Sequence, residues 1–237
     1  MASEGGWRPE AEVPVAAMVR HCCQLLRERV EQPETHRGLI VGCGTGDEVV
    51  YLRRAFRNAR IVGLDLEMKF TALARAEADL LLADATRLPF PPESFGFAAS
   101  FHALEHVGDA RRALAEVQRV LRPGAWFYVG VPNRSRLVGY VGSFDATLWQ
   151  KFAWNVQDYA ARLRGRFRNE LGAHAGFEGK ELVSLLETYF SHVQLVTEEF
   201  LRFKYGERLP RRVLNFLLAP RLINRSAPAH YAICQRG

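Results

Sequence analysis

Continuous apolar runs of strand length alternate along the chain with segments whose apolar residues recur at helical spacing. Strands that are buried on both faces have continuous apolar runs, and the helices that cover them have amphipathic ones. The pattern therefore predicts an α/β fold built around a mostly parallel sheet. The predicted strands are residues 38–41, 60–65, 80–83, 96–101, 126–131, 192–197 and 230–234.

Helices are predicted before the first strand and between most of the others. The clearest helix spans residues 109–122, where Asp109 can cap the amino end and Pro123-Gly124 can end the helix. The others are an opening helix within residues 13–31, with Pro14 near its first turn, and helices from about Asp47, from about Glu67 and over 179–189. Apolar residues on one face of each helix indicate packing against the sheet.

The alternation of strands and helices breaks after Pro132. Helical spacing continues there in a series of apolar residues: Leu148, Trp149, Phe152, Val156, Tyr159, Leu163 and Phe167. Residues 134–177 are therefore predicted to form a helical insertion, or lid, after the fifth strand. It separates a core at 37–133 from a last helix, two strands and a basic segment at 178–237, all within one domain over 1–237.

The composition is that of an ordinary globular protein, with 48% hydrophobic and 24% charged residues. These values exclude intrinsic disorder, a collagen-like chain and a disulfide-stapled miniprotein. The four cysteines form no Cys-x-x-Cys pair, which favours free thiols in a reducing cytoplasm. The first residues do not resemble a signal peptide and no apolar run is long enough to span a membrane, so we expect a cytoplasmic protein.

The formal net charge of +6 is concentrated near the end of the chain. Residues 200–226 hold seven lysines and arginines but only one acid, Glu207, interspersed with apolar side chains. This basic segment predicts either a surface that contacts an anionic membrane or an acidic substrate, or a connection that packs on the sheet and leaves its arginines in water. A nucleic-acid partner is disfavoured because no binding module or matching motif is present.

Three glycines, Gly42, Gly44 and Gly46, stand between the first strand and the next helix. Glycine allows a tight turn and a close approach of the backbone to a ligand at a helix amino terminus. A dinucleotide-binding loop would have its third glycine at position 47, where Asp47 stands instead. The carboxylate of Asp47 would repel a pyrophosphate, so the loop predicts a ligand without phosphate.

Two aspartates follow the next two predicted strands. Asp65 lies 19 residues beyond Gly46, where a carboxylate can accept hydrogen bonds from both hydroxyls of a ribose. Asp84 ends the third strand and is placed to meet an adenine ring. The glycine loop and these two acids together describe an adenosine site.

Five segments carrying these features resemble the class I S-adenosylmethionine-dependent methyltransferases. They are LIVGCGTG from Leu39, IVGLDLEM from Ile61, ADATRLPFPPESFGF from Ala83, ALEHVGDARRALAEVQRVLRPGAWFYVGVPNR from Ala103 and GAHAGFEGKELVSLLETYF from Gly172. Leu-Glu-His-Val and Pro-Asn-Arg in the fourth segment are similar to small-molecule methyltransferases related to ubiquinone-pathway enzymes.

The resemblance implies a Rossmann-like, seven-stranded sheet in the order 3-2-1-4-5-7-6 with the last strand antiparallel. It also implies S-adenosylmethionine as cofactor and methyl transfer by in-line displacement to an oxygen, nitrogen or carbon atom of a small molecule. The cofactor contacts it implies are Gly42, Cys43, Gly44, Thr45, Gly46, Asp65, Leu66, Asp84, Ala85, Phe101 and His102.

Two positions depart from the family pattern. Family members usually have an acid two residues before the first glycine and another at the start of the fourth strand, where this chain has Ile40 and Gly96. The first departure leaves open how the ammonium group of the cofactor is held. Both favour the alternative that the chain is a non-catalytic protein with a methyltransferase fold, and a nucleic-acid methyltransferase is a third hypothesis.

His102, Glu105 and His106 follow the fourth strand, on the side that faces the methyl donor in this fold. His106 and His102 are candidates for a general base or for orienting the substrate, and a structural hydrogen-bonding role is the alternative. The His-x-x-Glu-His order is not that of a zinc protease helix, so no metal site is predicted. His174, in the predicted lid, is a further candidate for substrate contact.

Overall fold

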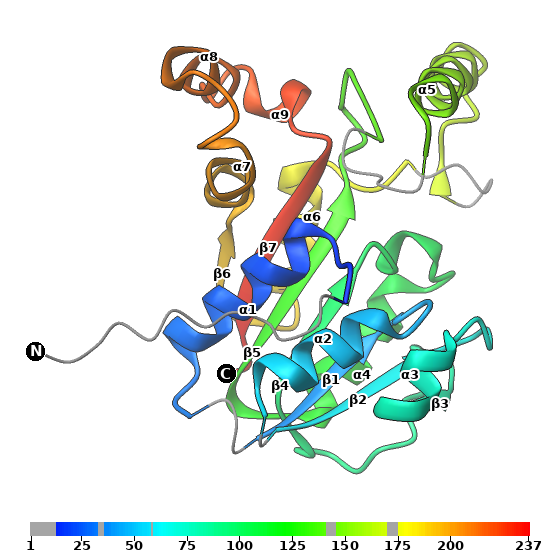
Figure 1. Cartoon of the computed structure of the whole chain (residues 1–237), viewed down its shortest axis with the longest axis vertical. Helices are drawn as coiled ribbons and strands as arrows, with labels where there is room; N and C mark the ends of the chain where they lie inside the picture. The colour runs from blue at the N-terminus through cyan, green and yellow to red at the C-terminus, as the bar shows by residue number, and fades with distance from the viewer. Residues whose placement is uncertain (1–12, 33–35, 58, 141–145, 170–174) are drawn as a thin grey trace, which may run out of the picture.

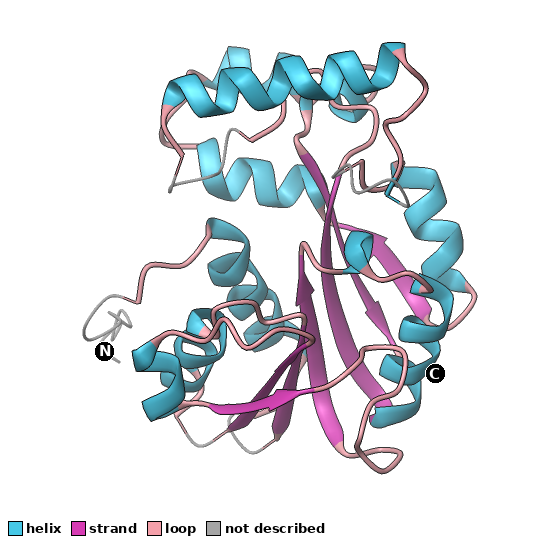
Figure 2. Ribbon diagram, turned by 90° about the vertical axis from the view of Figure 1, so that its right-hand side faces the viewer, coloured by secondary structure: helices cyan, strands magenta, loops and turns pink. Residues whose placement is uncertain are grey.

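A seven-stranded sheet forms the centre of the structure, with helices on both faces (Figures 1 and 2). The computed structural model describes residues 13–32, 36–57, 59–140, 146–169 and 175–237. The strands are β1 (Arg37–Val41), β2 (Arg60–Asp65), β3 (Asp79–Leu82), β4 (Phe95–Phe101), β5 (Leu121–Pro132), β6 (Ser191–Leu195) and β7 (Ala229–Gln235). Their order is β3-β2-β1-β4-β5-β7-β6, and β7 is antiparallel to both neighbours. The predicted fold class is confirmed.

The helices bury apolar side chains in two clusters, one on each face of the sheet. Helices α1, α2 and α7 contribute to one cluster, and α4 and α6 contribute to the other. The described helices are α1 (Ala17–Arg29), α2 (Asp47–Ala55), α3 (Ala72–Glu77), the 3₁₀ helix η2 (Leu104–His106), α4 (Ala110–Val120), α5 (Leu148–Leu163), α6 (Gly179–Glu187), α7 (Thr197–Tyr205), α8 (Arg211–Leu217) and α9 (Ile223–Ser226).

Helix α4 forms as predicted at its start and differs at its end. The Asp109 side chain accepts a hydrogen bond from the Arg112 backbone N–H at 2.9 Å and so caps the helix. The helix ends at Val120, and Pro123-Gly124 lies inside β5 rather than beyond the helix. The pairing of β5 with β4 changes register at this point, and such an irregularity accommodates a proline without loss of a ladder hydrogen bond.

Other predicted boundaries shift for local reasons. Helix α1 starts at Ala17, so Pro14 precedes it instead of lying in its first turn. The helix expected from Glu67 starts at Ala72, because the Thr71 side chain caps it by accepting a hydrogen bond from the Ala74 N–H at 3.1 Å. The predicted strand at 192–197 ends at Leu195, since the Thr197 hydroxyl accepts the Tyr231 N–H at 3.0 Å and α7 begins there.

The basic segment at 200–226 connects β6 to β7 through α7, α8 and α9. Its buried residues are apolar: Phe200, Leu201, Leu214 and Leu218. Its arginines, Arg202, Arg208, Arg211, Arg212, Arg221 and Arg225, are exposed. The segment is therefore a packed connection with a cationic outer surface. No helix among the described residues has both the length and the apolar character needed to cross a membrane.

Candidate active site

The glycine loop between β1 and α2 is held against the end of β2. The backbone N–H groups of Gly42 and Cys43 both donate to the Leu64 carbonyl, at 2.9 and 3.0 Å. All three glycines have positive φ, and a Cβ at Gly46 would lie 2.7 Å from the Cβ of Ala74. A side chain at Gly46 would therefore combine backbone strain with a clash against α3.

The same loop abuts the segment that follows β4. A Cβ added at Gly42 would lie only 2.2 Å from the Cβ of Ala103. Ala103 stands between His102 and the 3₁₀ helix η2, which contains Glu105 and His106. The structure thus brings the predicted cofactor loop and the predicted acceptor-side histidines to the same edge of the sheet.

Asp65 ends β2 beside this loop with its side chain half-buried. One carboxylate oxygen accepts a hydrogen bond from the Gly44 N–H at 2.8 Å, and the other accepts the Glu67 N–H at 3.0 Å. These bonds orient the carboxylate at the carboxyl end of the strand, where ligands bind in open α/β sheets. The position fits the predicted ribose contact.

The other predicted cofactor residues differ in exposure. Asp84 is exposed, and hydrogen bonds from the Thr86 backbone and side chain lower its pKa, which keeps the carboxylate ionised. The Leu66 side chain is 69% exposed and can cover a flat ring. Ala85 and Phe101 are buried, with the Phe101 ring 5.9 Å from that of Tyr128, so their side chains belong to the core.

A buried carboxyl lies between the two candidate histidines. Both side-chain oxygens of Glu105 are buried and have no hydrogen-bond partner. One of these oxygens lies 3.8 Å from Nδ1 of His102 and 3.9 Å from Nε2 of His106. Burial raises the pKa of Glu105 to about 8, so its neutral form predominates at pH 7.

The two histidines are held differently. His102 has a left-handed backbone with φ of 53°, and its N–H donates to the Gly130 carbonyl at 2.8 Å. Its ring centroid lies 6.2 Å from that of Tyr231 in an edge-on arrangement. The His106 side chain is 53% exposed and that of His102 is 33% exposed. His106 is therefore the more accessible of the two to an acceptor.

The family comparison identifies the central part of the chain. Residues 39–129 match the family model described as a methyltransferase domain. This segment is therefore similar to a methyltransferase domain. The matched segment includes the glycine loop, Asp65, Asp84 and the Glu105 cluster, and the seven-stranded order is that of the class I fold predicted from the sequence.

Known methyltransferases resemble the chain beyond this domain. A phthiotriol/phenolphthiotriol dimycocerosates methyltransferase of Mycobacterium tuberculosis is 31% identical over 169 residues, which are 65% of this chain and 62% of that protein. A 2-phytyl-1,4-naphtoquinone methyltransferase of Thermosynechococcus vestitus is 36% identical over 143 residues, 57% of this chain and 60% of that protein. The chain thus spans about three fifths of the length of these curated relatives.

The fold extends over nearly the whole chain in a solved structure. Phosphoethanolamine N-methyltransferase 2 of Haemonchus contortus, in complex with S-adenosyl-L-methionine, superimposes with a TM-score of 0.57 at 16% identity. The match covers 92% of this chain and 52% of that one. S-adenosylmethionine, the cofactor implied by the sequence resemblance, is the group bound in that structure.

Packing explains the two positions at which this chain departs from the pattern of the family it resembles. Ile40 is fully buried in the apolar cluster that α1 and α2 share with the sheet. At Gly96 an added Cβ would lie 2.6 Å from the His36 ring, so the ring fills the space that a side chain on β4 would need.

Glu48, in the first turn of α2, is an acid that the sequence analysis missed. Burial, and then the carboxylates of Asp47 and Asp65, raise its pKa to about 8. A cation next to this cluster would favour the ionised form of Glu48, because it would offset the neighbouring negative charges. The sequence signal was a second acid in the first turn after the glycine loop, but its half-buried position depends on the packing of α2.

Asp47 and Cys43 shape the loop from within. Asp47 accepts hydrogen bonds from the hydroxyls of Thr45 at 3.0 Å and Thr71 at 2.7 Å, and so ties the loop to the start of α3. The Cys43 sulfur is buried and points toward Gly63, where an added Cβ would be 2.9 Å away. Burial raises the pKa of Cys43 to about 12, which keeps it a thiol. Only its backbone therefore remains available to a ligand.

Two further expectations concern metals and the lid. Among the residues that the structure describes, no group of three histidines, cysteines or acids could hold a metal ion. His174 lies outside the described residues, as do 141–145 and the rest of 170–174 in the predicted lid. The site roles of the named residues stay predictions that the experiments below test.

The Glu105 pKa has a measurable consequence for stability. A carboxyl whose pKa is raised on folding binds more protons in the native than in the unfolded state, so stability falls as pH rises from about 4.5 to 8. Glu105→Gln lacks the titrating carboxyl and should not show this loss. We therefore expect its free energy of unfolding, relative to that of the parent, to rise by roughly 2 kcal/mol from pH 6 to pH 8. Urea unfolding at the two pH values measures the gain.

The matched control for this experiment is Glu187→Gln, because Glu187 is exposed at the end of α6. Its difference from the parent should be the same at both pH values. A Glu105→Gln difference that is also independent of pH would contradict the neutral, buried state of Glu105.

Proposed function

We propose that the chain is an S-adenosylmethionine-dependent methyltransferase that acts on a small-molecule acceptor. The observation that supports this proposal is the close packing of Gly42 against Ala103, because the glycine loop then lies beside the histidine segment within the matched residues. When an enzyme holds donor and acceptor side by side, their reaction becomes effectively unimolecular. Such positioning can lower the activation barrier by roughly 7–11 kcal/mol.

The chain has a residue for each polar part of the donor. The oriented carboxylate of Asp65 is proposed to accept the ribose hydroxyls, and Asp84 with Leu66 to hold the adenine. Glu48 is our candidate for the ammonium group, because Ile40 supplies no charge and Glu48 is a shielded acid next to Asp65. When bound, S-adenosylmethionine supplies a methyl group that its positively charged sulfur already activates.

The histidines are proposed to act on the acceptor. If an oxygen or nitrogen acceptor must lose a proton, His106 is exposed enough to take it, and His102 is the alternative base. Neutral Glu105 lies within 4 Å of both rings, so it is a candidate for positioning them rather than for balancing a charge.

The acceptor is proposed to be apolar. The two curated relatives are named as methyltransferases of phthiotriol dimycocerosates and of a phytyl naphthoquinone, names that suggest hydrocarbon-rich molecules. The basic segment at 200–226, with its exposed arginines, is proposed to contact an anionic membrane or an acidic substrate.

A non-catalytic binding protein is the second candidate, favoured by Ile40 and Gly96. We expect calorimetry to show binding of S-adenosylhomocysteine and no binding of NAD, since Asp47 disfavours a pyrophosphate in the first turn of α2. Metabolite extracts from cells with and without the gene, compared for methylated products, then separate catalysis from binding alone. Tight binding of NAD without a response to S-adenosylhomocysteine would refute the proposal.

A further inference from the structure

Helix α5 turns its polar side toward the protein and its apolar side outward. None of its residues is buried, although it is an amphipathic helix. A helix that covers a core has the opposite arrangement, with its apolar stripe inside. The orientation of α5 therefore needs an explanation other than packing among the residues that the structure describes.

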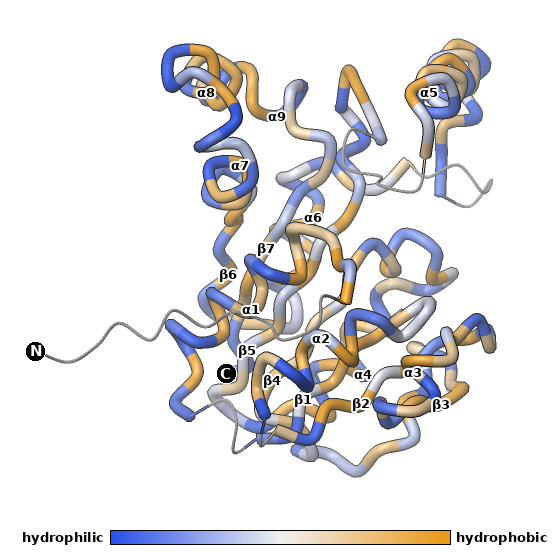
Figure 3. The backbone as a smooth tube through the Cα atoms, in the orientation of Figure 1, coloured by the Kyte–Doolittle hydropathy of each residue, from blue (hydrophilic) through white to orange (hydrophobic). Residues whose placement is uncertain are grey.

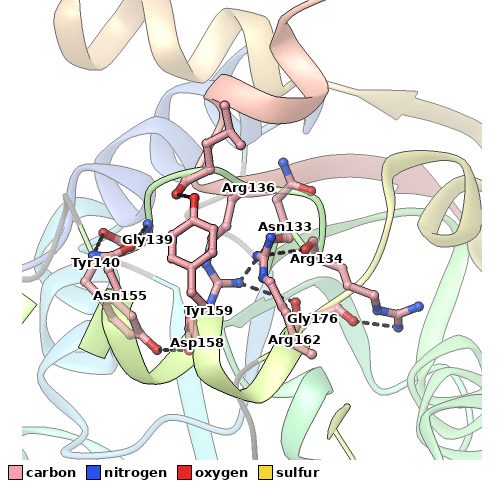
Figure 4. Close-up of polar contacts among 12 residues, drawn as sticks. Asn133, Arg134, Arg136, Gly139, Tyr140, Asn155, Asp158, Tyr159, Arg162 and Gly176 are labelled. Atoms are coloured by element: carbon pink, nitrogen blue, oxygen red, sulfur yellow. Dashed lines mark hydrogen bonds and ion pairs between the residues drawn. The ribbon is translucent and has the colours of Figure 1, made fainter. Parts of the chain in front are cut away.

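The inner side of α5 is fixed by polar contacts with the segment that follows β5 (Figure 4). Asp158 forms an ion pair with the buried guanidinium of Arg136 at 2.6 Å and accepts a hydrogen bond from the Tyr140 hydroxyl at 3.1 Å. The Asn155 side chain accepts the Gly139 N–H at 2.7 Å and donates to the Gly139 carbonyl.

Arg162 extends this set by donating to the Arg134 carbonyl at 3.0 Å. Breaking a buried ion pair strongly destabilises the folded protein. Rotation of α5 to bury its other side would break the Arg136–Asp158 pair, so the ion pair opposes that rotation.

The outer side of α5 carries a continuous apolar stripe. At about 100° per residue its members fall within roughly 100° of the helix circumference. They are 44–90% exposed and comprise Leu148, Trp149, Phe152, Val156, Tyr159 and Leu163. Within the stripe the Trp149 and Phe152 rings stack with their centroids 5.6 Å apart. The exposed Leu137 lies beside the stripe, because its carbonyl accepts a hydrogen bond from the Tyr159 hydroxyl. We call the six apolar residues of the helix the α5 stripe.

Three exposed arginines follow the carboxyl end of the α5 stripe. They are Arg164, Arg166 and Arg168.

Helices α5 and α8 lie at the same end of the molecule, beyond the carboxyl end of β5, and α5 lies along that end (Figures 1 and 2). Hydrophobic residues occur on both helices there (Figure 3). On α8 the exposed apolar side chains are Val213, Phe216 and Leu217, next to the exposed Arg211 and Arg212.

We propose that this end of the protein docks onto an anionic lipid membrane, with the α5 stripe inserted at the interface. An apolar stripe flanked by cations matches a bilayer of anionic lipids, whereas a second copy of the chain would oppose cations with cations. The docking itself does not depend on catalysis, but together with the proposed function it suggests a route for the acceptor. An apolar acceptor could then reach the site from the membrane.

The test uses the full chain and vesicles of phosphatidylcholine with or without phosphatidylglycerol. We expect the parent to co-sediment with the anionic vesicles and its affinity for them to weaken as salt is added. The double variant Leu148→Gln/Leu163→Gln should bind these vesicles more weakly by about tenfold or more. These two leucines are 85% and 90% exposed, so the substitutions leave the fold intact. The control Leu82→Gln changes an exposed leucine on the edge strand β3 and should bind vesicles like the parent.

Three results would overturn the docking surface. They are equal vesicle binding by the double variant and the parent, no binding to anionic vesicles, or a self-associated parent that the double variant converts to monomer. Calorimetry with S-adenosylhomocysteine on the same proteins keeps this test apart from that of the proposed function. Vesicle binding without ligand binding would refute the methyltransferase activity and retain the docking surface.

Discussion

Replacing His106 with alanine is expected to lower the turnover of methyl transfer about 10²–10⁴-fold, the usual contribution of a general base. His106 follows β4 on the side where Gly42 meets Ala103, and its half-exposed ring is open to an acceptor. Affinity for S-adenosylhomocysteine should stay close to that of the parent, because the residue lies on the acceptor side. Turnover is measured with the acceptor that metabolite comparison identifies, and affinity by calorimetry.

A structural role for His106 gives a different result. Loss of a hydrogen bond that only anchors η2 should cost about 0.5–1.5 kcal/mol of stability and leave turnover near normal. His102→Ala is the companion variant, since His102 is equally close to Glu105 but less exposed. If His106→Ala keeps its turnover and His102→Ala loses it, the base is His102.

Replacing Asp65 with alanine is expected to weaken cofactor binding about ten- to a hundredfold or more. A hydrogen bond to a charged group contributes roughly 1.5–3 kcal/mol, and two ribose hydroxyls are expected to donate to this carboxylate. The substitution also removes the acceptor for the Gly44 and Glu67 N–H groups, so the glycine loop loses an anchor. The dissociation constant for S-adenosylhomocysteine, measured by calorimetry, reports both effects.

The control for this variant is Asp79→Ala, which removes an exposed carboxylate on β3 that pairs with Arg60 at 2.8 Å. It should bind the cofactor like the parent. Asp65→Asn keeps one acceptor oxygen and should fall between the parent and Asp65→Ala. If folded Asp65→Ala binds with an unchanged dissociation constant, another residue holds the ribose.

Features set by short-range chemistry were predictable from the sequence. The glycine loop could be identified because the positive φ of Gly42, Gly44 and Gly46 is a local backbone conformation that glycine adopts far more readily than other residues. The strands could be identified because both faces of the sheet are covered, which favours continuous apolar runs such as residues 125–129 in β5. The strand order itself followed from the family resemblance, not from the pattern.

Boundaries were less predictable where a side chain from another element decides them. Thr71 sets the start of α3 by capping it, and Asp47 holds Thr71 from across the loop. Pro123 stands within a strand because β5 changes register against β4 at that point. The cap itself is a local signal, but the Asp47–Thr71 hydrogen bond and the pairing of β5 with β4 each join residues far apart along the chain.

The sequence by itself determined the class of fold, the glycine loop and the acids at the strand ends, because these depend on local conformation and strand burial. Only the tertiary structure showed that Glu105 is buried without a hydrogen-bond partner and that Glu48 is shielded beside Asp65. It also decided which way α5 faces. Periodicity places its apolar residues on one side of the helix, but the Arg136–Asp158 ion pair turns that side outward.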